Sequence, residues 1–438
     1  MSARILAIQV LSRVRATDAY LNVVLDTMLS ESPPRDPRDA ALATELVYGA
    51  TRRQLGLDYA LSRVADRKLE SLEDRVLAAL RVGAYQLFHT RVPARAAVAE
   101  TVQAIKDLGV VRAAGFVNAI LRKLAELPGP PWPPESDVAE YLSVRESHPR
   151  WLVERWIRHF GRERAEAMLV ANNQTPPIVV RVNTSKVTRE ALLEQLREVG
   201  LDAQPTFASP VGIILPPVGR LEEVYGYAEG LWQVQDEAAQ LVGVYASIPE
   251  TARVFDACAA PGGKACYLAQ SHEVVAADLH ANKLPKIESE AKRLGLSARL
   301  KAVAHDATQP LPSELGEFHA VLIDAPCSGL GTLRRHPELR YRRKEEDIGR
   351  LAALQRRILE NCQQVVPPGG LLVYAVCTTE PQEGVDQVDM FLRSHPEWTA
   401  EPPVIQGVKM PMNQGWLRTL PGLEGWDGFF AARLRKLH

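Results

Sequence analysis

The chain has 438 residues, with 52 Lys and Arg against 53 Asp and Glu, and 46% of its residues are hydrophobic. This length suggests about three domains, and so much apolar side chain at almost zero net charge excludes a disordered protein. The longest uncharged stretch, residues 361–379, contains prolines, glycines and glutamines and cannot span a bilayer. Arginines interrupt the apolar positions at the N-terminus, unlike a signal peptide, so we expect a cytoplasmic protein.

The first 126 residues predict helices throughout. Apolar residues recur at helical spacing over 21–29 and 76–87, with weaker patterns of the same kind elsewhere. We therefore expect residues 1–126 to form an all-α bundle.

A proline-rich stretch at 127–140 follows, and it predicts a stiff linker because proline removes backbone donors and disfavours helix in the preceding residue. Residues 141–235 then mix helical patterns with β-branched runs, which indicates a small α+β module. Its predicted helices cover 151–160, 162–171 and 189–199, and its predicted strands cover 178–182 and 211–215.

From residue 236 to 438, strands alternate with helical or loop segments. Such alternation predicts an α/β domain with a doubly wound sheet, which binds its ligand at the carboxyl ends of the strands. The predicted strands cover 252–255, 273–277, 299–303, 320–323 and 371–375.

The first of these strands runs into Asp256-Ala-Cys-Ala-Ala-Pro-Gly-Gly-Lys264. Two adjacent glycines between a strand and a helix allow a tight turn and a close approach of backbone to ligand. The dinucleotide pattern G-x-G-x-x-G and the phosphate-binding G-x-x-x-x-G-K-[ST] are both absent. The sequence therefore favours a cofactor without a pyrophosphate.

Aspartates follow the successive strands, namely Asp256, Asp278, Asp306 and Asp324. A single aspartate there is as readily explained as a helix or turn cap, but four at successive strand ends favour a ligand site. Asp278 stands about where an acidic residue meets ribose hydroxyls in Rossmann-type sites.

Five cysteines are present, all after residue 257, and the spacing fits neither a disulfide framework nor a zinc site. We expect reduced thiols and no metal. Cys327 and Cys377 each follow a strand at the predicted ligand edge, where a thiolate could act as a nucleophile beside Lys264. We expect a structural role for the other three cysteines, Cys258, Cys266 and Cys362.

These strings resemble the RsmB/Sun/NOP family of S-adenosylmethionine-dependent RNA cytosine-C5 methyltransferases. The resemblance rests on D-A-C-A-A-P-G-G-K, on D-A-P-C-S-G and on Cys377 followed by Glu380-Pro381 and Glu383. The segments 334–338 and 425–430 and Arg181-Val-Asn183 fit the same pattern, and 115–123 resembles a NusB-type RNA-binding domain. The domain order resembles the branch that methylates 16S ribosomal RNA.

The resemblance implies an RNA-binding NusB-like bundle, an RNA-binding α+β module and a Rossmann-like domain whose mostly parallel sheet has seven strands. It implies S-adenosylmethionine as cofactor and 16S ribosomal RNA, free or in a partly assembled subunit, as partner of a monomer that binds no membrane. Asp306 would face the adenine, and Asp324 would lie between cofactor and base. The implied cofactor-binding residues are Cys258, Ala259, Ala260, Pro261, Gly262, Gly263, Lys264, Asp278, Asp306 and Asp324.

The implied reaction begins with attack of Cys377 on C6 of cytosine, which makes C5 able to take a methyl group. Asp324 would contact the base near N3 and would need a raised pKa to act as an acid. Lys264 is counted with Asp324 among the catalytic residues. Cys327 would then assist release of Cys377 from the product. The chain departs from the family where Leu330 replaces a more usual threonine and where Val376 precedes the nucleophile.

Six basic residues fall within 334–344, directly after the D-A-P-C loop. Such a run can be a solvated helix face, but its place at the rim of the predicted cleft favours phosphate contact, and the target base must leave its stack to reach the thiol. The expected RNA-binding residues are Arg334, Arg335, Arg340, Arg342 and Arg343.

Three alternatives remain open at this point. One is a non-catalytic RNA-binding assembly factor, and the second is a DNA cytosine-C5 methyltransferase, in which the Pro-Cys thiol is itself the nucleophile. The third is 5-methylcytosine formation in another RNA, such as tRNA or 23S ribosomal RNA. The sequence leaves the exact nucleotide undetermined.

Overall fold

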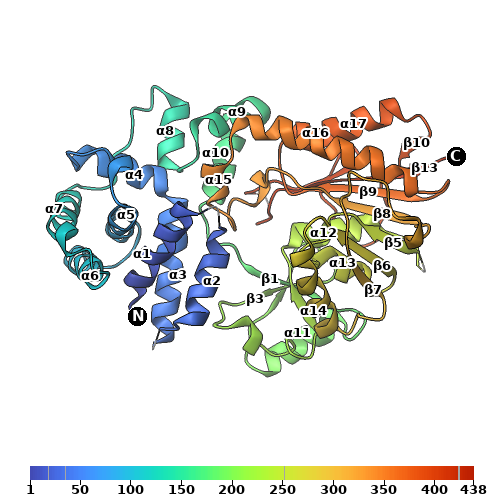
Figure 1. Cartoon of the computed structure of the whole chain (residues 1–438), viewed down its shortest axis with the longest axis horizontal. Coiled ribbons are helices and arrows are strands. Elements are labelled where there is room, and N and C mark those ends of the chain that lie inside the picture. The colour runs from blue at the N-terminus through green and yellow to red at the C-terminus, as the bar shows by residue number, and fades with distance from the viewer. Residues whose placement is uncertain (18, 35, 251, 423–424) are drawn as a thin grey trace. The chain divides into compact units, whose positions relative to one another are not determined.

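The computed structural model describes residues 1–17, 19–34, 36–250, 252–422 and 425–438. The chain forms two compact units (Figure 1). The helical unit comprises residues 1–175 and 333–342, and the sheet unit comprises 176–332 and 343–438. The chain therefore leaves the sheet unit for ten residues, contributes them to the helical unit and returns.

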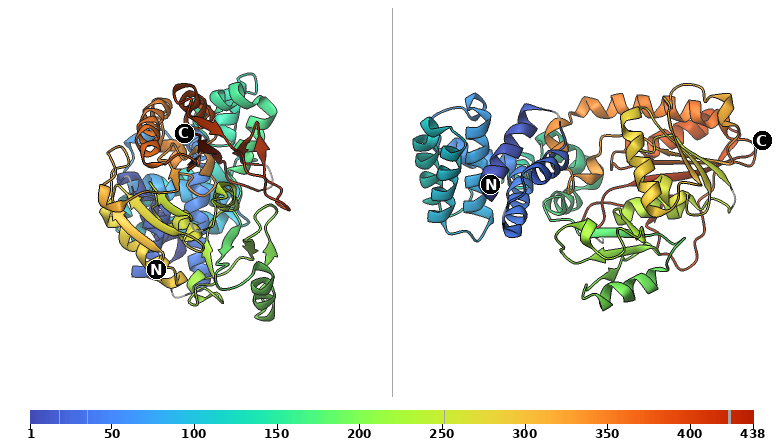
Figure 2. Two further views of the ribbon diagram at one scale, coloured as in Figure 1. Left: turned by 90° about the vertical axis from the view of Figure 1, so that its right-hand side faces the viewer. Right: turned by 60° about the horizontal axis from the view of Figure 1, so that its bottom comes forward.

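The helical unit contains no strand in its described residues, as the sequence predicts for 1–126, and Figure 2 shows its N-terminal helices gathered side by side. Its helices are α1 (Ala3–Ala16), α2 (Leu21–Glu31), α3 (Pro37–Arg52), α4 (Gln54–Val64), α5 (Asp74–His89), α6 (Ala94–Asp107), α7 (Ala114–Ala125), α8 (Val138–Arg145), α9 (Arg150–Phe160), α10 (Arg162–Ala171) and α15 (Leu339–Arg342).

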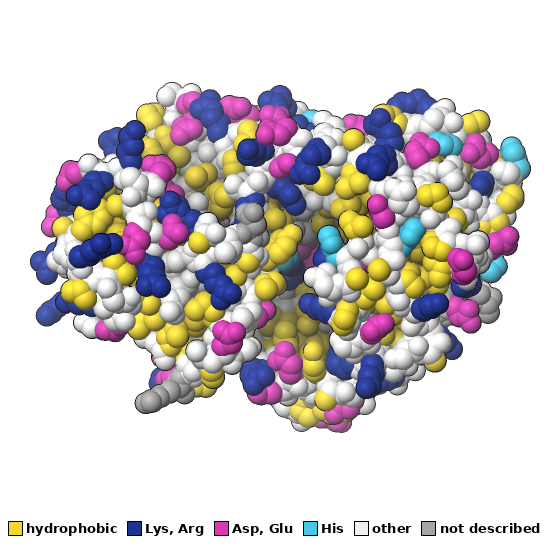
Figure 3. Space-filling view, viewed as in Figure 1, with side chains coloured by type: hydrophobic (Ala, Val, Ile, Leu, Met, Phe, Trp, Pro, Cys, Tyr) yellow, Lys and Arg dark blue, Asp and Glu magenta, His cyan; other side chains and the backbone are white. Residues whose placement is uncertain are grey.

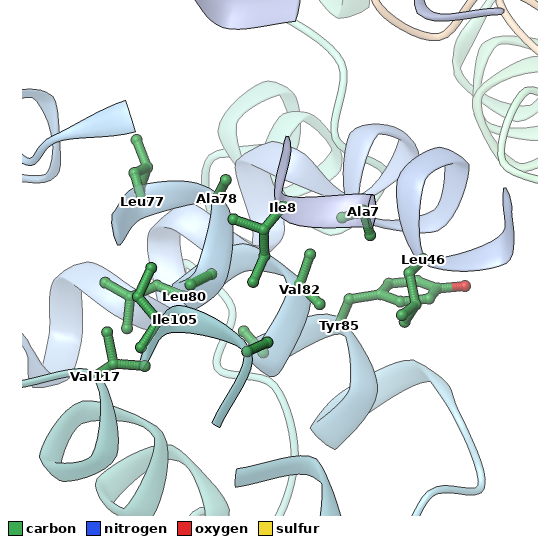
Figure 4. Packing of buried hydrophobic residues seen from close by; sticks show 14 of the residues in the cluster. Ala7, Ile8, Leu46, Leu77, Ala78, Leu80, Val82, Tyr85, Ile105 and Val117 are labelled. Atoms are coloured by element: carbon green, nitrogen blue, oxygen red, sulfur yellow. The ribbon is translucent and has the colours of Figure 1, made fainter. Parts of the chain in front are cut away.

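The core of this unit lies between α1, α5, α6 and α7. Ile8, Leu80, Ile105 and Val117 come from these four helices, are fully buried, and lie together in Figure 4. Burying one such side chain contributes about 1.5–3 kcal/mol. The helical spacing of apolar residues thus produces a single continuous core.

Helices α8 to α10 belong to the helical unit. The sequence predicts one module over 141–235 after a linker at 127–140, whereas the compact units divide after Thr175. One contact that attaches this part of the chain to the bundle is a hydrogen bond of 3.0 Å, which the Gly56 amide of α4 donates to Ser147 Oγ. The proline-rich stretch therefore runs within the helical unit, and the predicted module of residues 141–235 includes residues of both compact units.

The segment 333–342 is part of the helical unit through Arg340, which is fully buried. Its guanidinium donates hydrogen bonds to the carbonyls of Ser147 and Asn172, each at 3.1 Å, and to Asn173 Oδ1 at 2.9 Å. Burial lowers the pKa of Arg340 to about 10, so the side chain stays cationic at neutral pH. A buried cation with this many acceptors ties the segment to the loops around α8 and α10.

The sheet unit begins with an antiparallel sheet of order β2-β3-β1-β4. These strands are β1 (Ile178–Val182), β2 (Gln204–Pro205), β3 (Gly212–Leu215) and β4 (Trp232–Val234), with α11 (Arg189–Glu198) between β1 and β2. Val180 and Val182 of β1 and Ile213 of β3 pack with Leu192 and Leu196 of α11. This is the α+β module that the β-branched runs predict.

The second sheet has the order β11-β12-β13-β9-β8-β5-β6-β7, with β10 paired to β13. The pairs from β9 to β7 are parallel, and β13 runs antiparallel to β9. Its strands are β5 (Arg253–Asp256), β6 (Glu273–Asp278), β7 (Leu300–Ala304), β8 (Ala320–Asp324), β9 (Leu371–Val376), β10 (Trp398–Ala400), β11 (Met412–Asn413), β12 (Trp416–Arg418) and β13 (Phe430–Lys436).

The described residues of this sheet give nine strands rather than the seven that the resemblance implies. The differences lie at the antiparallel end, where β10, β11 and β12 have only two or three residues each. Such short edge strands depend on pairing with β13 rather than on their own sequence pattern. The parallel part agrees with the predicted strands.

Side chains of the second sheet alternate between its two faces. Val254 and Leu322 pack in the core that includes α12 to α14, while Phe255 and Val321 pack in the core that includes Ile358 of α16. Figure 1 shows α16 and α17 running along the sheet. The helices are α12 (Glu237–Ala246), α13 (Gly263–Leu268), α14 (Leu284–Leu294), α16 (Glu345–Cys362) and α17 (Val385–Ser394).

No helix in the described ranges has both the length and the apolar character that crossing a membrane requires.

Candidate active site

The polar residues that the sequence singles out meet at one edge of the large sheet. Asp256, Asp278 and Asp324 are the last residues of β5, β6 and β8, and Cys377 directly follows β9. These strands are parallel and adjacent, so their carboxyl ends share one edge. This is the edge at which the alternating pattern predicts a ligand.

The loop between β5 and α13 requires its glycine. Gly262 has a φ of +106°, which L side chains rarely adopt, and a Cβ there would lie 3.3 Å from the Ile287 backbone. Asp278 accepts a hydrogen bond from the Ala260 amide at 3.2 Å, which ties this loop to the end of β6. A tight glycine turn beside an acidic strand end fits a cofactor with a ribose and an amino-acid end.

Arg181 of β1 supports the same loop from the small sheet. Its buried guanidinium donates to the Gly263 carbonyl at 2.5 Å, to Gln233 Oε1 at 2.7 Å and to Gln235. Burial lowers the pKa of Arg181 to about 10. Sequence reasoning noted Arg181 only within the family pattern, although a charged residue inside the apolar run 178–182 was the signal of a specific partner.

Lys264 and Asp324 form an ion pair with an Nζ–Oδ2 distance of 2.5 Å. Burial alone would lower the pKa of Lys264, but the Asp324 carboxylate more than offsets this, so the pKa is raised and the group is an ammonium. The ammonium lies 5.4 Å from the centre of the Phe429 ring, a contact that sequence reasoning did not predict. The pair presents a fixed donor and acceptor beside the thiols.

Asp256 lies behind this pair without solvent contact, and neither of its carboxylate oxygens has a hydrogen-bond partner within the described part of the chain. Burial, with repulsion from Asp324, raises the pKa of Asp256 to about 7. Sequence reasoning treated Asp256 as one of four equivalent aspartates, but it is the one sealed inside the protein.

Cys327 and Cys377 lie with their sulfur atoms 3.3 Å apart, and both side chains are partly accessible. The hydrogen bond to Cys377, followed by burial, raises the pKa of Cys327 well above its usual value. Of the remaining thiols, Cys266 and Cys362 are buried and Cys258 is partly accessible. Burial raises the pKa of Cys266 and Cys362 to about 12 and raises that of Cys258 as well. The structure thus brings together the two thiols that the sequence selects.

Asp306 lies two residues beyond β7, and its Oδ1 accepts hydrogen bonds from the amide and hydroxyl of Thr308 at 2.9 and 2.8 Å. These bonds, the amide first, lower the pKa of Asp306. The carboxylate therefore caps a turn through one oxygen, as the simpler interpretation of such an aspartate predicts.

The arginines after the D-A-P-C loop have different environments. Arg334 and Arg340 are buried in the helical unit, and Arg335 and Arg342 are half-buried there. Arg343 is in the sheet unit and donates from Nε to the Ser328 carbonyl at 2.9 Å. The charges suggest a single solvated or phosphate-facing run, but its arginines are divided between the two units and differ in burial. On the face shown in Figure 3, basic and acidic side chains are interspersed.

The two departures from the family pattern lie in the core. Leu330 and Val376 are both fully buried. A hydroxyl at either position would need a buried partner, and the apolar side chains avoid that requirement.

Three family descriptions match the chain. Residues 1–126 match the NusB family, residues 148–219 match the RsmF/B-like ferredoxin-like domain, and residues 246–435 match the 16S rRNA methyltransferase RsmB/F.

Curated relatives match over the whole length. The ribosomal RNA small subunit methyltransferase B of Pseudomonas syringae pv. tomato is 36% identical, covering 100% of this chain and 97% of that protein. The probable ribosomal RNA small subunit methyltransferase B of Synechocystis is 35% identical, with all of both chains covered, and that of Bacillus subtilis is 32% identical with 99% of each covered.

Solved structures support the fold. The crystal structure of PH0851 has a TM-score of 0.85 at 24% identity, covering 100% of this chain and 99% of that one. The structure of NSun6 from Pyrococcus horikoshii with SFG has a TM-score of 0.59 at 23% identity, covering 67% of this chain and 99% of that one.

Full-length identity above 30% and the matched domains agree with the site, and they stand against the non-catalytic alternative. The cofactor is S-adenosylmethionine, and the glycine turn and Asp278 fit it. The chain belongs to the RsmB/F family of S-adenosylmethionine-dependent 16S ribosomal RNA methyltransferases and carries the NusB domain at its N-terminus.

Proposed function

We propose that this protein methylates C5 of a specific cytosine in 16S ribosomal RNA through a covalent bond between Cys377 and C6 of the base. The observation that carries the proposal is the pair of accessible thiols 3.3 Å apart, at neighbouring strand ends beside the Lys264–Asp324 pair. S-adenosylmethionine supplies the electrophilic methyl group, and loop residues 258–264, Asp278 and Asp306 hold it.

In the first step the Cys377 thiolate adds to C6, and the electron pair of the C5–C6 double bond moves towards N3 and C5. C5 then resembles an enamine carbon and accepts the methyl group. Lys264 and Asp324 hold fixed polar atoms for the pyrimidine edge, and a sulfur anion at Cys377 faces the Lys264 ammonium. In this pair the donor is Lys264, whereas the sequence assigns the proton to Asp324.

Release reverses the addition. The C5–H electron pair forms the double bond again, the proton leaves to water, the C6–S bond breaks and its electrons return to the Cys377 sulfur. Cys327 assists because its thiol, 3.3 Å away, donates a hydrogen bond to the departing thiolate. The DNA-enzyme alternative instead makes Cys327 the nucleophile.

RNA contact is the less direct part of the proposal. Arg334 and Arg340 are buried, so we assign them to the stability of the segment that carries the half-buried Arg335 and Arg342. We assign phosphate contact to Arg335, Arg342 and Arg343. We expect the bundle and the ferredoxin-like sheet to capture RNA. We also expect the protein to act as a monomer in the cytoplasm.

The test is to map 5-methylcytosine in ribosomal RNA and tRNA from cells with and without this protein, and to repeat methylation with purified protein. We expect one cytosine of 16S ribosomal RNA to lose its methyl group in the cells without the protein. A lost methyl group in tRNA or 23S ribosomal RNA instead would favour the alternative RNA, and activity on duplex DNA would contradict the proposal.

A further inference from the structure

Glu383 is a fully buried carboxylate in the short turn Pro381–Glu383 that follows the Cys377 loop. Its Oε1 accepts hydrogen bonds from the Ser328 amide at 2.8 Å and from Gln355 Nε2 at 3.0 Å. Its Oε2 accepts one from Ser328 Oγ at 2.5 Å. Three donors converge on this carboxylate, so its buried charge is compensated.

This arrangement determines which hydroxyl donates in each hydrogen bond. Ser328 gives its only hydroxyl proton to Glu383, so in the 2.9 Å contact between Ser328 Oγ and Thr378 Oγ1 the proton comes from Thr378. Ser328 directly follows Cys327, and Thr378 directly follows Cys377. The chain Thr378 to Ser328 to Glu383 therefore joins the two loops that carry the thiols.

We propose that Glu383 is a positioning residue that makes the two thiols unequal. Its hydrogen bonds hold the Cys327 loop against the Cys377 loop, and its negative charge keeps Cys327 in the thiol form, so that Cys377 is the attacking sulfur. The inference deepens the proposed function, on which it rests, and it assigns the chemical difference between the cysteines to a residue outside the reacting pair.

The charges around the site agree with this assignment. Burial raises the pKa of Glu383, while the bonds from Ser328 and Gln355 oppose that rise. The hydrogen bond to Cys377, burial and the charge of Cys377 raise the pKa of Cys327 most, and the charge of Glu383 adds to them. Other titratable or charged groups near the network include Tyr374, whose hydroxyl donates to the Glu383 carbonyl, and Arg343, which donates to the Ser328 carbonyl. Glu380, Cys377 and Lys264 also lie near it.

The turn that carries Glu383 is fixed independently of its carboxylate. Tyr374 OH donates to the Glu383 carbonyl at 2.5 Å, and the Gly384 amide donates to the Glu380 carbonyl at 3.2 Å. A change of the Glu383 side chain to an amide of the same shape therefore leaves the turn in place. An amide oxygen still accepts from Ser328 N and Gln355, and its NH2 donates to Ser328 Oγ, so Glu383→Gln removes the charge and keeps the link.

The first test measures the pH dependence of iodoacetamide labelling at Cys327 and Cys377, by peptide mass spectrometry, in the full-length protein without cofactor. Glu383→Gln should move the labelling midpoint of Cys327 down by about one pH unit. Asp389→Asn removes a carboxylate at an exposed position of α17 and should leave that midpoint unchanged. An unchanged Cys327 midpoint in Glu383→Gln would overturn the proposal that the negative charge of Glu383 keeps Cys327 in the thiol form.

The second test separates positioning from binding. Thr378→Val should lower kcat by at least about tenfold while KM for RNA and S-adenosylmethionine binding stay at wild-type values, because only the relative position of the thiols changes. A wild-type kcat in Thr378→Val would overturn the proposal that the hydrogen bonds to Glu383 position the two thiols. Failure of the wild-type protein to form 5-methylcytosine would contradict the proposed function instead, and the labelling shift would still be measurable.

Discussion

The buried Asp256 predicts an unusual dependence of stability on pH, which Asp256→Asn isolates. Below pH about 4 the carboxyl is protonated in both the folded and the unfolded chain. Between about 4 and 7 the unfolded chain releases the proton while the folded protein retains it, because burial raises the folded pKa from 3.8 to about 7. Stability present at low pH is therefore lost as pH rises to 7, and it stays lost above that value.

The magnitude follows from the size of the pKa shift. At about 1.4 kcal/mol for each pKa unit, the full cost approaches about 4 kcal/mol, and about 3 kcal/mol of it accrues between pH 5 and pH 8. Asparagine has the shape of the neutral carboxyl, so the variant does not pay this cost. We expect Asp256→Asn to gain about 3 kcal/mol over wild type on going from pH 5 to pH 8.

The assay is thermal unfolding of both proteins without cofactor at the two pH values. In a domain of this size 1 kcal/mol corresponds to roughly 2–4 °C in Tm, so the difference between variant and wild type should grow by roughly 6–12 °C. Asp389→Asn, at an exposed position of α17, is the control and should show no such growth. Equal differences at pH 5 and pH 8 would refute the reasoning.

Three further predictions follow from the site and its supports. Cys377→Ala should abolish methylation without a covalent RNA species, whereas Cys327→Ala should accumulate a ribonuclease-sensitive adduct on a denaturing gel; the reverse pattern would make Cys327 the nucleophile. Arg181→Met removes the donor to the Gly263 carbonyl and should weaken S-adenosylmethionine binding at least about tenfold by calorimetry, equivalent to about 1.4 kcal/mol, while unchanged affinity would leave Arg181 a role in folding only. Charge reversal at Arg335 and Arg342 should weaken RNA binding and flatten its salt dependence with cofactor binding intact, and an unchanged slope would leave both with a structural role only.

Much of the arrangement at this edge of the large sheet was predictable because each part has a local signature. The β-branched runs fix β5, β6, β8 and β9, and a residue that ends a parallel strand lies at the ligand edge whatever its partners. Gly262 and the two cysteines could therefore be assigned from position alone. The aspartates could not be ranked in this way, because only three-dimensional burial distinguishes Asp256 from Asp278 and Asp324.

The predictions that differ from the structure concern long-range partners. The charges at 334–344 suggest an exposed run, but the acceptors of Arg340 are carbonyls of residues 147 and 172, more than 160 positions away. The division between the compact units after Thr175 also depends on a long-range contact, since the Gly56 amide of α4 donates to Ser147, which follows α8. Neither relation leaves a periodic pattern in the chain.

The ten residues at 333–342 also affect the order in which the protein can fold during synthesis. The helical unit begins at the N-terminus, yet its buried Arg340 is made 165 residues after Thr175. At about 5–20 residues per second, this delay amounts to roughly 8–33 seconds. Throughout that interval the carbonyls of Ser147 and Asn172 lack the guanidinium that pairs with them, and most of the sheet unit is translated before the helical unit can be completed.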